Sequence, residues 1–303
     1  MIRRAAFALT LVPVLSLACS EKSAPPAAGS PTAADNTALA DEACPRIDKP
    51  FFFVVRRNGQ ASYLLGTRHA GVRLAKLPAF VGKQLDAARV VVVEHVDSVA
   101  TKAAPPTTTA APAAGSAEPG TATVLGPKQW ATYAALVGPE VAARVRDRSP
   151  AMAMASLALL YEDAGQSIDA EILARARAAG KELVPLDTAA DSADATSSLL
   201  GPDALAEALA TIPSRAAIRA STALTLGEYC AGKVPPPSAG GSAVDERRRA
   251  STARRTEAWL PRLEPLLTAG GAFIAVGNAH VAEAGGLRDL LRERGYEVSY
   301  VEE

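Results

Sequence analysis

Apolar runs along the chain predict an α/β fold with a mixed central sheet. Two strand-like runs, residues 51–57 and 60–65, flank the pair Asn58-Gly59, and such a pair between two strands is typical of a β-hairpin. The valine run at residues 89–94 has no polar alternation, as expected of a strand buried on both faces. The early part of the chain therefore predicts an N-terminal hairpin followed by a buried strand.

A mostly helical block is expected between these early strands and the last ones. Helical patterns occur at residues 78–88, 129–137, 139–147, 151–164, 169–179, 202–231 and 244–267. A short strand is predicted within this block at residues 182–187, after the helix that stops at Gly180. Strand 272–276, helix 286–294 and strand 296–301 close the chain and predict a parallel, right-handed β-α-β unit.

Residues 101–123 interrupt the folded pattern. They consist mainly of Ala, Pro, Thr and Gly, with no aromatic residue and no aliphatic side chain larger than Ala. Such a segment buries too little apolar surface to offset the entropy of ordering. It therefore predicts a disordered surface insertion.

The N-terminus predicts a secretory signal peptide over residues 1–18. A basic start at residues 1–4 precedes the apolar stretch 5–17 and the small residue Ala18. The stretch is too short to cross a bilayer, which takes about 20 apolar residues. Cys19 follows directly and is similar to the bacterial lipobox cysteine, which is acylated; an ordinary signal peptide with an incidental cysteine is the alternative.

The next segment, residues 19–43, is rich in Ala, Pro, Ser and Thr and predicts a lipid-anchored flexible tether. Residues 44–303 are then long enough for one sizeable domain, without a clear internal boundary. We therefore expect an exported lipoprotein, anchored to a membrane and facing the periplasm or the cell surface.

Charge and cysteine content narrow the possible partners and the compartment. The chain has 32 basic (Lys and Arg) and 32 acidic side chains, so there is no electrostatic case for nucleic-acid binding. If Cys19 carries lipid, Cys44 and Cys230 remain. In an oxidising compartment two remaining cysteines predict one disulfide, with two unpaired thiols as the alternative.

One short motif occurs twice, each time after a predicted strand: Gly66-x-x-His69 and Gly277-x-x-His280. The two motifs hold two of the three histidines of the chain. Histidine is the commonest side-chain metal ligand and the usual acid or base near neutral pH. Glycine lets the chain turn sharply as it leaves a strand. We expect the sheet to bring both imidazoles together at one edge.

Two carboxylates fall at the ends of other predicted strands. Glu94 ends the valine run, and Asp187 ends the short strand inside the helical block. Ligands of open α/β sheets bind outside the carboxyl ends of the strands. Two imidazoles and a carboxylate are a set that suits a divalent metal, so His69, His280 and Glu94 form the predicted metal site.

Simpler interpretations remain open for each of these residues. His280 would serve as a helix cap, and Glu94 would pair with an arginine, Arg68 or Arg255. Asp187 is more typical of a turn than of a ligand. His95 would face away from Glu94 if the strand continued, because side chains alternate along a strand.

The ordered set of motifs resembles the TraB/GumN family, which includes the membrane-tethered Tiki metalloproteases. The resemblance rests on residues 63–69, the valine strand that ends at Glu94, residues 168–169 and 180–187, Arg255 with Trp259, and residues 276–280 and 286–296. The chain has Thr256 where this family usually has Asn. The resemblance implies a metal-dependent hydrolase that uses Mn²⁺ or a similar divalent ion.

The resemblance also implies metal or catalytic roles for His69, His280 and Glu94, with Arg255 as a nearby polar contact. In the leading hypothesis, Glu94 is a ligand or general base, and Arg255 is a candidate for stabilising a developing oxyanion. The expected function is a metal-dependent peptidase of the cell envelope acting on a peptide or protein. The alternatives are a non-catalytic lipoprotein that binds or sequesters a peptide, and a metal-dependent esterase or lactonase.

Overall fold

The computed structural model describes residues 29–96, 119–188, 191, 200–234 and 243–301 of the chain. The predicted signal peptide, Cys19, and residues 101–118 of the predicted insertion lie outside the described residues. None of the helices within the described ranges is both long and apolar enough to cross a membrane.

A mixed sheet is the centre of the fold, as predicted. Its described strands are β1 (Phe52–Arg57), β2 (Gln60–Thr67), β3 (Val90–Val93), β4 (Glu182–Pro185), β5 (Ala272–Gly277) and β6 (Glu297–Tyr300). They lie in the order β4-β3-β5-β2-β1-β6. The strands β4, β3, β5 and β2 pair in parallel, and β1 is antiparallel to both of its neighbours. The carboxyl ends of the four parallel strands therefore share one edge of the sheet.

The hairpin between β1 and β2 has the predicted turn. Asn58 and Gly59 both have positive φ, 50° and 77°. A two-residue turn with this geometry matches the right-handed twist of the flanking strands. The Asn-Gly pair is therefore sufficient to set the register in which Arg57 lies opposite Gln60.

The C-terminal strands show a detail that the local pattern does not contain. β5 and β6 run in the same direction, as predicted, but they do not pair with each other. β6 instead pairs antiparallel with β1, so that β2 and β1 lie between β5 and β6. This position covers the edge of the hairpin, whose unpaired backbone groups would otherwise be exposed.

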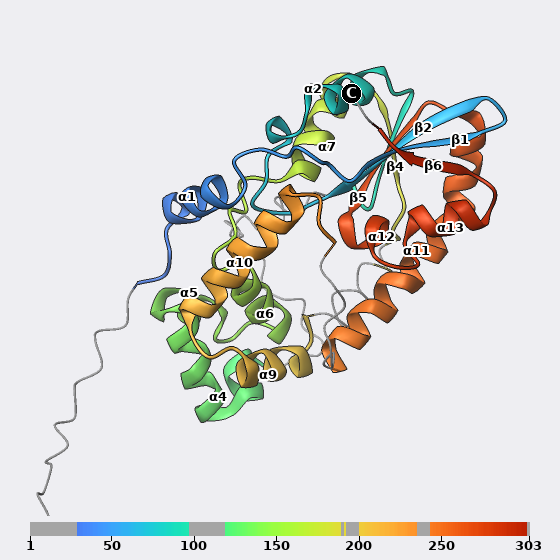
Figure 1. Cartoon of the computed structure of the whole chain (residues 1–303). Coiled ribbons are helices and arrows are strands. Elements are labelled where there is room, and N and C mark those ends of the chain that lie inside the picture. Colours follow the sequence, from blue (N-terminus) through green and yellow to red (C-terminus); the bar gives the residue numbers. More distant parts are fainter. Residues whose placement is uncertain (1–28, 97–118, 189–190, 192–199, 235–242, 302–303) are drawn as a thin grey trace, which may run out of the picture.

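Helices cover both faces of the sheet (Figure 1). On one side lie α2 (Ala79–Ala87) and α7 (Ile168–Ala178), and on the other α11 (Ala243–Ala269), α12 (Asn278–Ala282) and α13 (Leu287–Glu293). The short 3₁₀ helix η1 (Leu74–Lys76) precedes α2. The core between these layers contains the valines of β3, which are fully or almost fully buried as their apolar run predicts.

A second hydrophobic core lies in the helical block. The block contains α4 (Thr121–Val137), α5 (Pro139–Val145), α6 (Pro150–Ala158) and α9 (Pro202–Thr211), and its core includes the buried side chains of Tyr133, Leu157 and Leu205. The predicted helix at 202–231 is two helices, α9 and α10 (Arg215–Cys230). The break occurs because Ser214 caps α10: its side chain accepts a hydrogen bond from the Ala217 amide.

The predicted tether is wrong for nearly half of its length, because α1 (Ala33–Ala43) is a helix. A capping box between Thr32 and Asp35 starts this helix, and the buried Leu39 and Ala40 anchor it. Its end is tied to the end of α10 by the predicted disulfide, Cys44–Cys230, whose Cα atoms are 5.7 Å apart. The folded part therefore begins about ten residues earlier than composition suggests, because composition does not register caps and crosslinks.

The predicted insertion also ends earlier than expected. Thr121 begins α4, is fully buried, and donates its hydroxyl hydrogen to the carbonyl of Arg148. Gly126 has a positive φ of 68° and separates this first turn from the part of α4 that the sequence predicted. Residues 121–123 therefore belong to the helical block, since tertiary contacts compensate for their weak helix propensity.

Candidate functional site

The sheet brings the four predicted polar residues to one edge. His69 lies two residues beyond the end of β2, Glu94 directly follows β3, Asp187 lies two residues beyond β4, and His280 follows β5 in α12. The Asp187 amide donates to the Glu94 carbonyl at 2.8 Å, which extends the pairing of β3 and β4 past the strand ends. The convergence expected from the parallel strands is therefore present.

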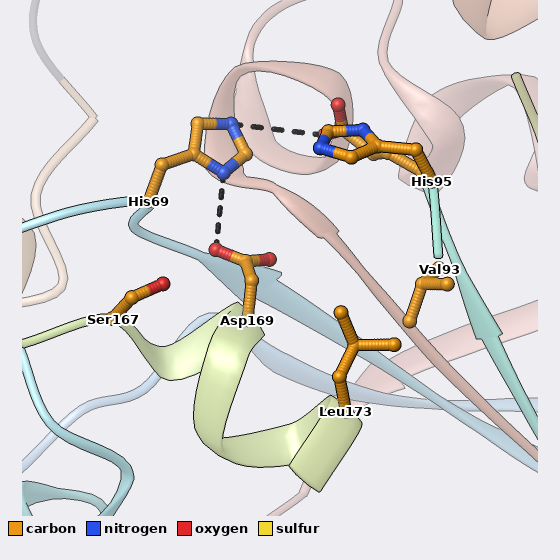
Figure 2. Close-up of a pocket in the computed structure, with 7 residues that line it drawn as sticks. His69, Val93, His95, Ser167, Asp169 and Leu173 are labelled. Carbon is orange, nitrogen blue, oxygen red and sulfur yellow. Dashed lines mark hydrogen bonds and ion pairs between the residues drawn. The ribbon is translucent and has the colours of Figure 1, made fainter. Parts of the chain in front are cut away.

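His69 is oriented by a carboxylate of α7, one of the helices that cover the sheet. Its Nδ1 lies 3.0 Å from Oδ2 of Asp169, in the first turn of α7 (Figure 2). The other carboxylate oxygen of Asp169 accepts a hydrogen bond from the Thr67 hydroxyl at 2.6 Å. With Nδ1 engaged in this way, Nε2 of His69 faces Glu94, 3.9 Å from its Oε1. This is the arrangement in which a carboxylate orients a metal-binding histidine.

His280 is oriented by a hydroxyl group of α11. Oγ1 of Thr256 lies 2.7 Å from Nδ1 of His280, and the same hydroxyl lies 2.6 Å from the carbonyl of Thr252. A hydroxyl has one hydrogen to donate, and a carbonyl is only an acceptor. The network therefore assigns the hydrogen to Nδ1 of His280 and leaves the lone pair on Nε2. His280 is 4% exposed and packs against the Trp259 ring, with centroids 4.3 Å apart.

Glu94 lies between these histidines and is 6% exposed. Its Oε1 accepts a hydrogen bond from the Gly277 amide at 2.6 Å, and its Oε2 accepts one from Nη2 of Arg255 at 3.1 Å. Burial alone would raise the pKa of Glu94, but the charges of His69, His280 and Arg255 outweigh it and lower that pKa to about 2. The carboxylate is therefore ionised throughout the neutral range.

The two histidines differ in their electrostatic environment. The His69 side chain is 47% exposed; the loss of solvation on its inner side opposes a charge, but the carboxylates of Asp169 and Glu94 outweigh this and raise the pKa of His69 to about 9. The pKa of His280 is lowered to about 4, mainly because the ring is buried. The positive charges of Arg255 and His69 lower this pKa further, and the carboxylate of Glu94 compensates only in part.

Arg255 contacts Glu94, Asp187 and His280. Its Nη2 donates to Asp187 at 2.5 Å as well as to Glu94, and its Nη1 lies 3.4 Å from Nε2 of His280. Asp187 also accepts a hydrogen bond from the Trp259 indole at 2.7 Å. Asp187 is not in a turn, contrary to the simpler interpretation: it is 8% exposed and anchors the guanidinium of Arg255. The pairing of Arg255 with Glu94 was one of the open alternatives and is present.

His95 lies in a different place from the one expected. Strict alternation along a strand would turn it away from Glu94, but β3 ends at Val93 and the alternation ends with it. His95 is half-buried, and its ring lies across a small pocket from His69, above α7 (Figure 2). The ligand atoms of Glu94, His95 and Asp187 all lie within 4.8 Å of one another, and this group could hold a metal ion.

The motif glycines are required by space and not by an unusual turn. Gly277 has φ −52°, which any residue adopts. A Cβ atom there, however, would lie 2.9 Å from both Oε1 of Glu94 and Nε2 of His69. A Cβ atom on Gly66 would lie 2.5 Å from Oδ1 of Asn278. Gly277 therefore makes room for His69 of the first motif, and Gly66 makes room for Asn278 of the second.

A large cleft opens over this set of residues. It has a volume of about 1020 Å³, and His69, Glu94, Arg255 and His280 are among its lining residues. The remaining lining comes mainly from the end of α10, the first half of α11, and α12 with the loop after it. The candidate centre therefore lies where a polymeric ligand could reach it.

Residues 168–169 and Thr256 entered the sequence analysis only through the family resemblance, and neither Asp169 nor Thr256 was given a role in the site. An acidic residue in the first turn of a helix is usually explained by the helix dipole, and a threonine within a helix carries no signal of its own. Only the packing of α7 and α11 on the sheet edge brings them to the imidazole nitrogens.

The model of the TraB/PrgY/gumN family matches residues 51–300, a range that contains all four residues at the strand ends. No curated protein and no solved structure matched the chain significantly. Because the family match covers most of the chain, we conclude that this protein belongs to the TraB/PrgY/gumN family.

Proposed function

We propose that this protein is a metal-dependent hydrolase of the cell envelope that acts as a peptidase on a peptide or protein. One observation carries the proposal: both motif histidines have Nδ1 engaged by an orienting side chain, Asp169 or Thr256, so that Nε2 is the atom left for a ligand. Metal-binding histidines typically have their other ring nitrogen held by such a partner.

The donor types suit a divalent metal, although among the described residues the ligand atoms that already lie within 4.8 Å of one another are those of Glu94, His95 and Asp187. His69, Glu94 and His280 would hold the metal, and Mn²⁺ or a similar ion suits two imidazoles with a carboxylate. The missing Cβ of Gly277 supports this assignment, because it leaves open the space next to both His69 and Glu94. Bound there, the ion would act as a Lewis acid toward a carbonyl of the substrate.

The protein's own groups would then divide the remaining work. The low pKa of Glu94 favours its role as an ionised ligand over that of a general base, since a carboxylate with pKa about 2 is a weak base. Arg255 is held by Asp187 beside the cleft and would stabilise negative charge that develops on the substrate oxygen.

The test is metal analysis of the purified protein followed by a peptide-library cleavage assay with and without chelator. We expect stoichiometric divalent metal, and cleavage that chelator abolishes and Mn²⁺ restores. Ester and lactone substrates tested in the same assay distinguish a peptidase from a metal-dependent esterase or lactonase. Metal-free protein that never cleaves any of these substrates would contradict the proposal.

One observation favours a second candidate, a lipoprotein that binds a peptide without cleaving it. The guanidinium of Arg255 already contacts Glu94 and His280, so a cation occupies part of the space between the proposed ligands. If this arrangement persists with metal in solution, the cleft would bind peptides without chemistry. Arg255→Ala then separates the candidates: it should raise metal affinity in a binding protein and lower the cleavage rate in an enzyme.

We also propose that Cys19 is acylated and anchors the protein to a membrane. The disulfide between Cys44 and Cys230 supports export, because disulfides persist in oxidising compartments. The proposed centre would then work close to the envelope surface.

A further inference from the structure

The walls of the large cleft carry an excess of positive charge, although the chain as a whole has none. Among the described residues that line it, the cations are Arg68, Lys233, Arg248, Arg249 and Arg255, and the carboxylates are Glu94 and Glu283. A cleft lined by one sign of charge concentrates ligands of the other sign. The charge of the lining therefore indicates which ligands the cleft attracts, and the proposed metal site does not.

Three of these cations are already neutralised. Arg68 pairs with Glu162, outside the cleft lining, and Arg248 pairs with Glu283 at 3.1 Å. Arg255 pairs with Glu94 and with Asp187, as described above. Two cations of the lining, Lys233 and Arg249, have no ion pair with any described residue.

Lys233 and Arg249 come from opposite sides of a gap in the described chain, but both line the same cleft. Lys233 follows the end of α10 and is exposed, and Arg249 is half-buried on α11. On α11, Arg249 lies six residues before Arg255, which corresponds to about 9 Å along the helix axis at ~1.5 Å per residue. An extended peptide covers that distance with about three residues.

The surface between these two arginines suits a peptide backbone. Thr252 and Ala253 of α11 line the cleft there, and they follow Arg249 at the helical spacing of three and four residues. Sites for single-stranded nucleic acid commonly offer exposed aromatic rings on which bases stack. The tyrosine among the described lining residues, Tyr229, is buried and its hydroxyl donates to the Gly66 carbonyl.

We propose that the cleft selects peptides that carry a carboxylate about three residues from the bond at the centre, recognised by Lys233 and Arg249. This inference rests on the proposed function, which places the reacting bond at the proposed metal site. Binding of the carboxylate itself does not require that the peptide be cleaved. The carboxylate is either an acidic side chain or the C-terminus of the peptide. Both sources present the same group to the two cations.

The test is calorimetric titration of the protein, kept in chelator so that no cleavage occurs. The probes are ten-residue peptides of Ala, Gly, Ser and Leu with amidated C-termini that differ at one central position, which is Glu, Gln or Lys. A fourth probe is the Gln peptide with a free C-terminus. We expect the Glu peptide to bind about tenfold more tightly than the Gln peptide at low salt, and the difference to shrink as salt screens the charges.

Variants assign the effect to the two cations. The double variant Lys233→Gln/Arg249→Gln should remove the preference for Glu, whereas Arg247→Gln should keep it. Arg247 is a matched control because it is exposed on the same helix but is not part of the cleft lining. If the free C-terminus restores tight binding of the Gln peptide, the carboxylate of the chain end is a sufficient source.

Equal affinity for the Glu and Gln peptides with amidated ends, and no gain from a free C-terminus, would overturn the proposal. An equal loss of preference in the Arg247→Gln control would also overturn it, and so would tighter binding of a single-stranded oligonucleotide than of the Glu peptide. Failure of the proposed hydrolase is a separate result, because it appears in metal content and cleavage and leaves this binding preference unchanged.

Discussion

Gly277 lies directly against His69: a Cβ atom on the glycine of the second motif would be 2.9 Å from Nε2 of the histidine of the first. The same Cβ atom would be equally close to Oε1 of Glu94. The two Gly-x-x-His motifs are therefore parts of one interlocked structure, although more than 200 residues separate them in the chain. Space requires the glycine here, and backbone conformation does not, since its φ of −52° is open to any residue.

Gly277→Ala should therefore disturb the centre more than the fold. We expect a loss of about 1–3 kcal/mol of unfolding free energy from the overpacking, together with at least a tenfold loss of Mn²⁺ affinity. Chemical denaturation and calorimetric metal titration measure the two effects. Gly82→Ala in α2 is the control: its Cβ would meet only the flexible end of Arg175, and helix propensity should make it neutral or stabilising.

His280→Ala distinguishes two possible metal sites. If the motif histidines and Glu94 hold the ion, His280→Ala should lower Mn²⁺ affinity by more than about tenfold, and His95→Ala should have a much smaller effect. If Glu94, His95 and Asp187 hold it, the order is reversed. Metal titration of both variants decides the matter, with circular dichroism as the check that each variant is folded.

Thr256→Val tests the orientation of His280. Valine removes the oxygen that lies 2.7 Å from Nδ1, so we expect the ring to lose its fixed hydrogen position and Mn²⁺ affinity to fall by about tenfold. Nitrogen NMR of the imidazole in the metal-free protein reports the hydrogen position directly. Thr256→Ser keeps the hydroxyl and should behave as the wild type; if both variants bind metal normally, the hydroxyl has no orienting role.

Breaking the Cys44–Cys230 disulfide should lower stability strongly. The bond closes a loop of 186 residues in sequence, for which loop entropy gives about 5 kcal/mol. Denaturant unfolding of the wild type and of the Cys44→Ser/Cys230→Ser variant measures this difference in unfolding free energy. Mass spectrometry of a non-reduced digest checks the bond itself, and two free thiols in the exported protein would contradict it.

Cys19→Ser tests the anchor. If acylation holds the protein at a membrane, the variant should move from the detergent-extracted fraction to the soluble periplasm or medium, provided that its signal is still cleaved. Fractionation followed by immunoblotting measures the distribution. Wild-type protein that is already soluble would show that residues 1–18 are an ordinary secretion signal.

The sequence by itself determined the elements and the outline of the site. Strand runs, the Asn58-Gly59 turn and most helix positions depend on neighbours in the chain, and hydrophobic periodicity records those neighbours. The convergence of His69, Glu94 and His280 was also predictable, because residues after parallel strands share one edge. The disulfide followed from the count of cysteines and the expected compartment.

Only the tertiary structure decided which groups meet at that edge. Asp169 and Thr256 reach the imidazoles, and Asp187 reaches Arg255, through the packing of α7 and α11 on the sheet. The position of β6 beside β1, and the helix α1 in a segment whose composition predicts a tether, likewise depend on partners far away in the chain. Local patterns record burial and turns, but a pairwise contact between distant residues exists only after the strands and helices have been ordered in space.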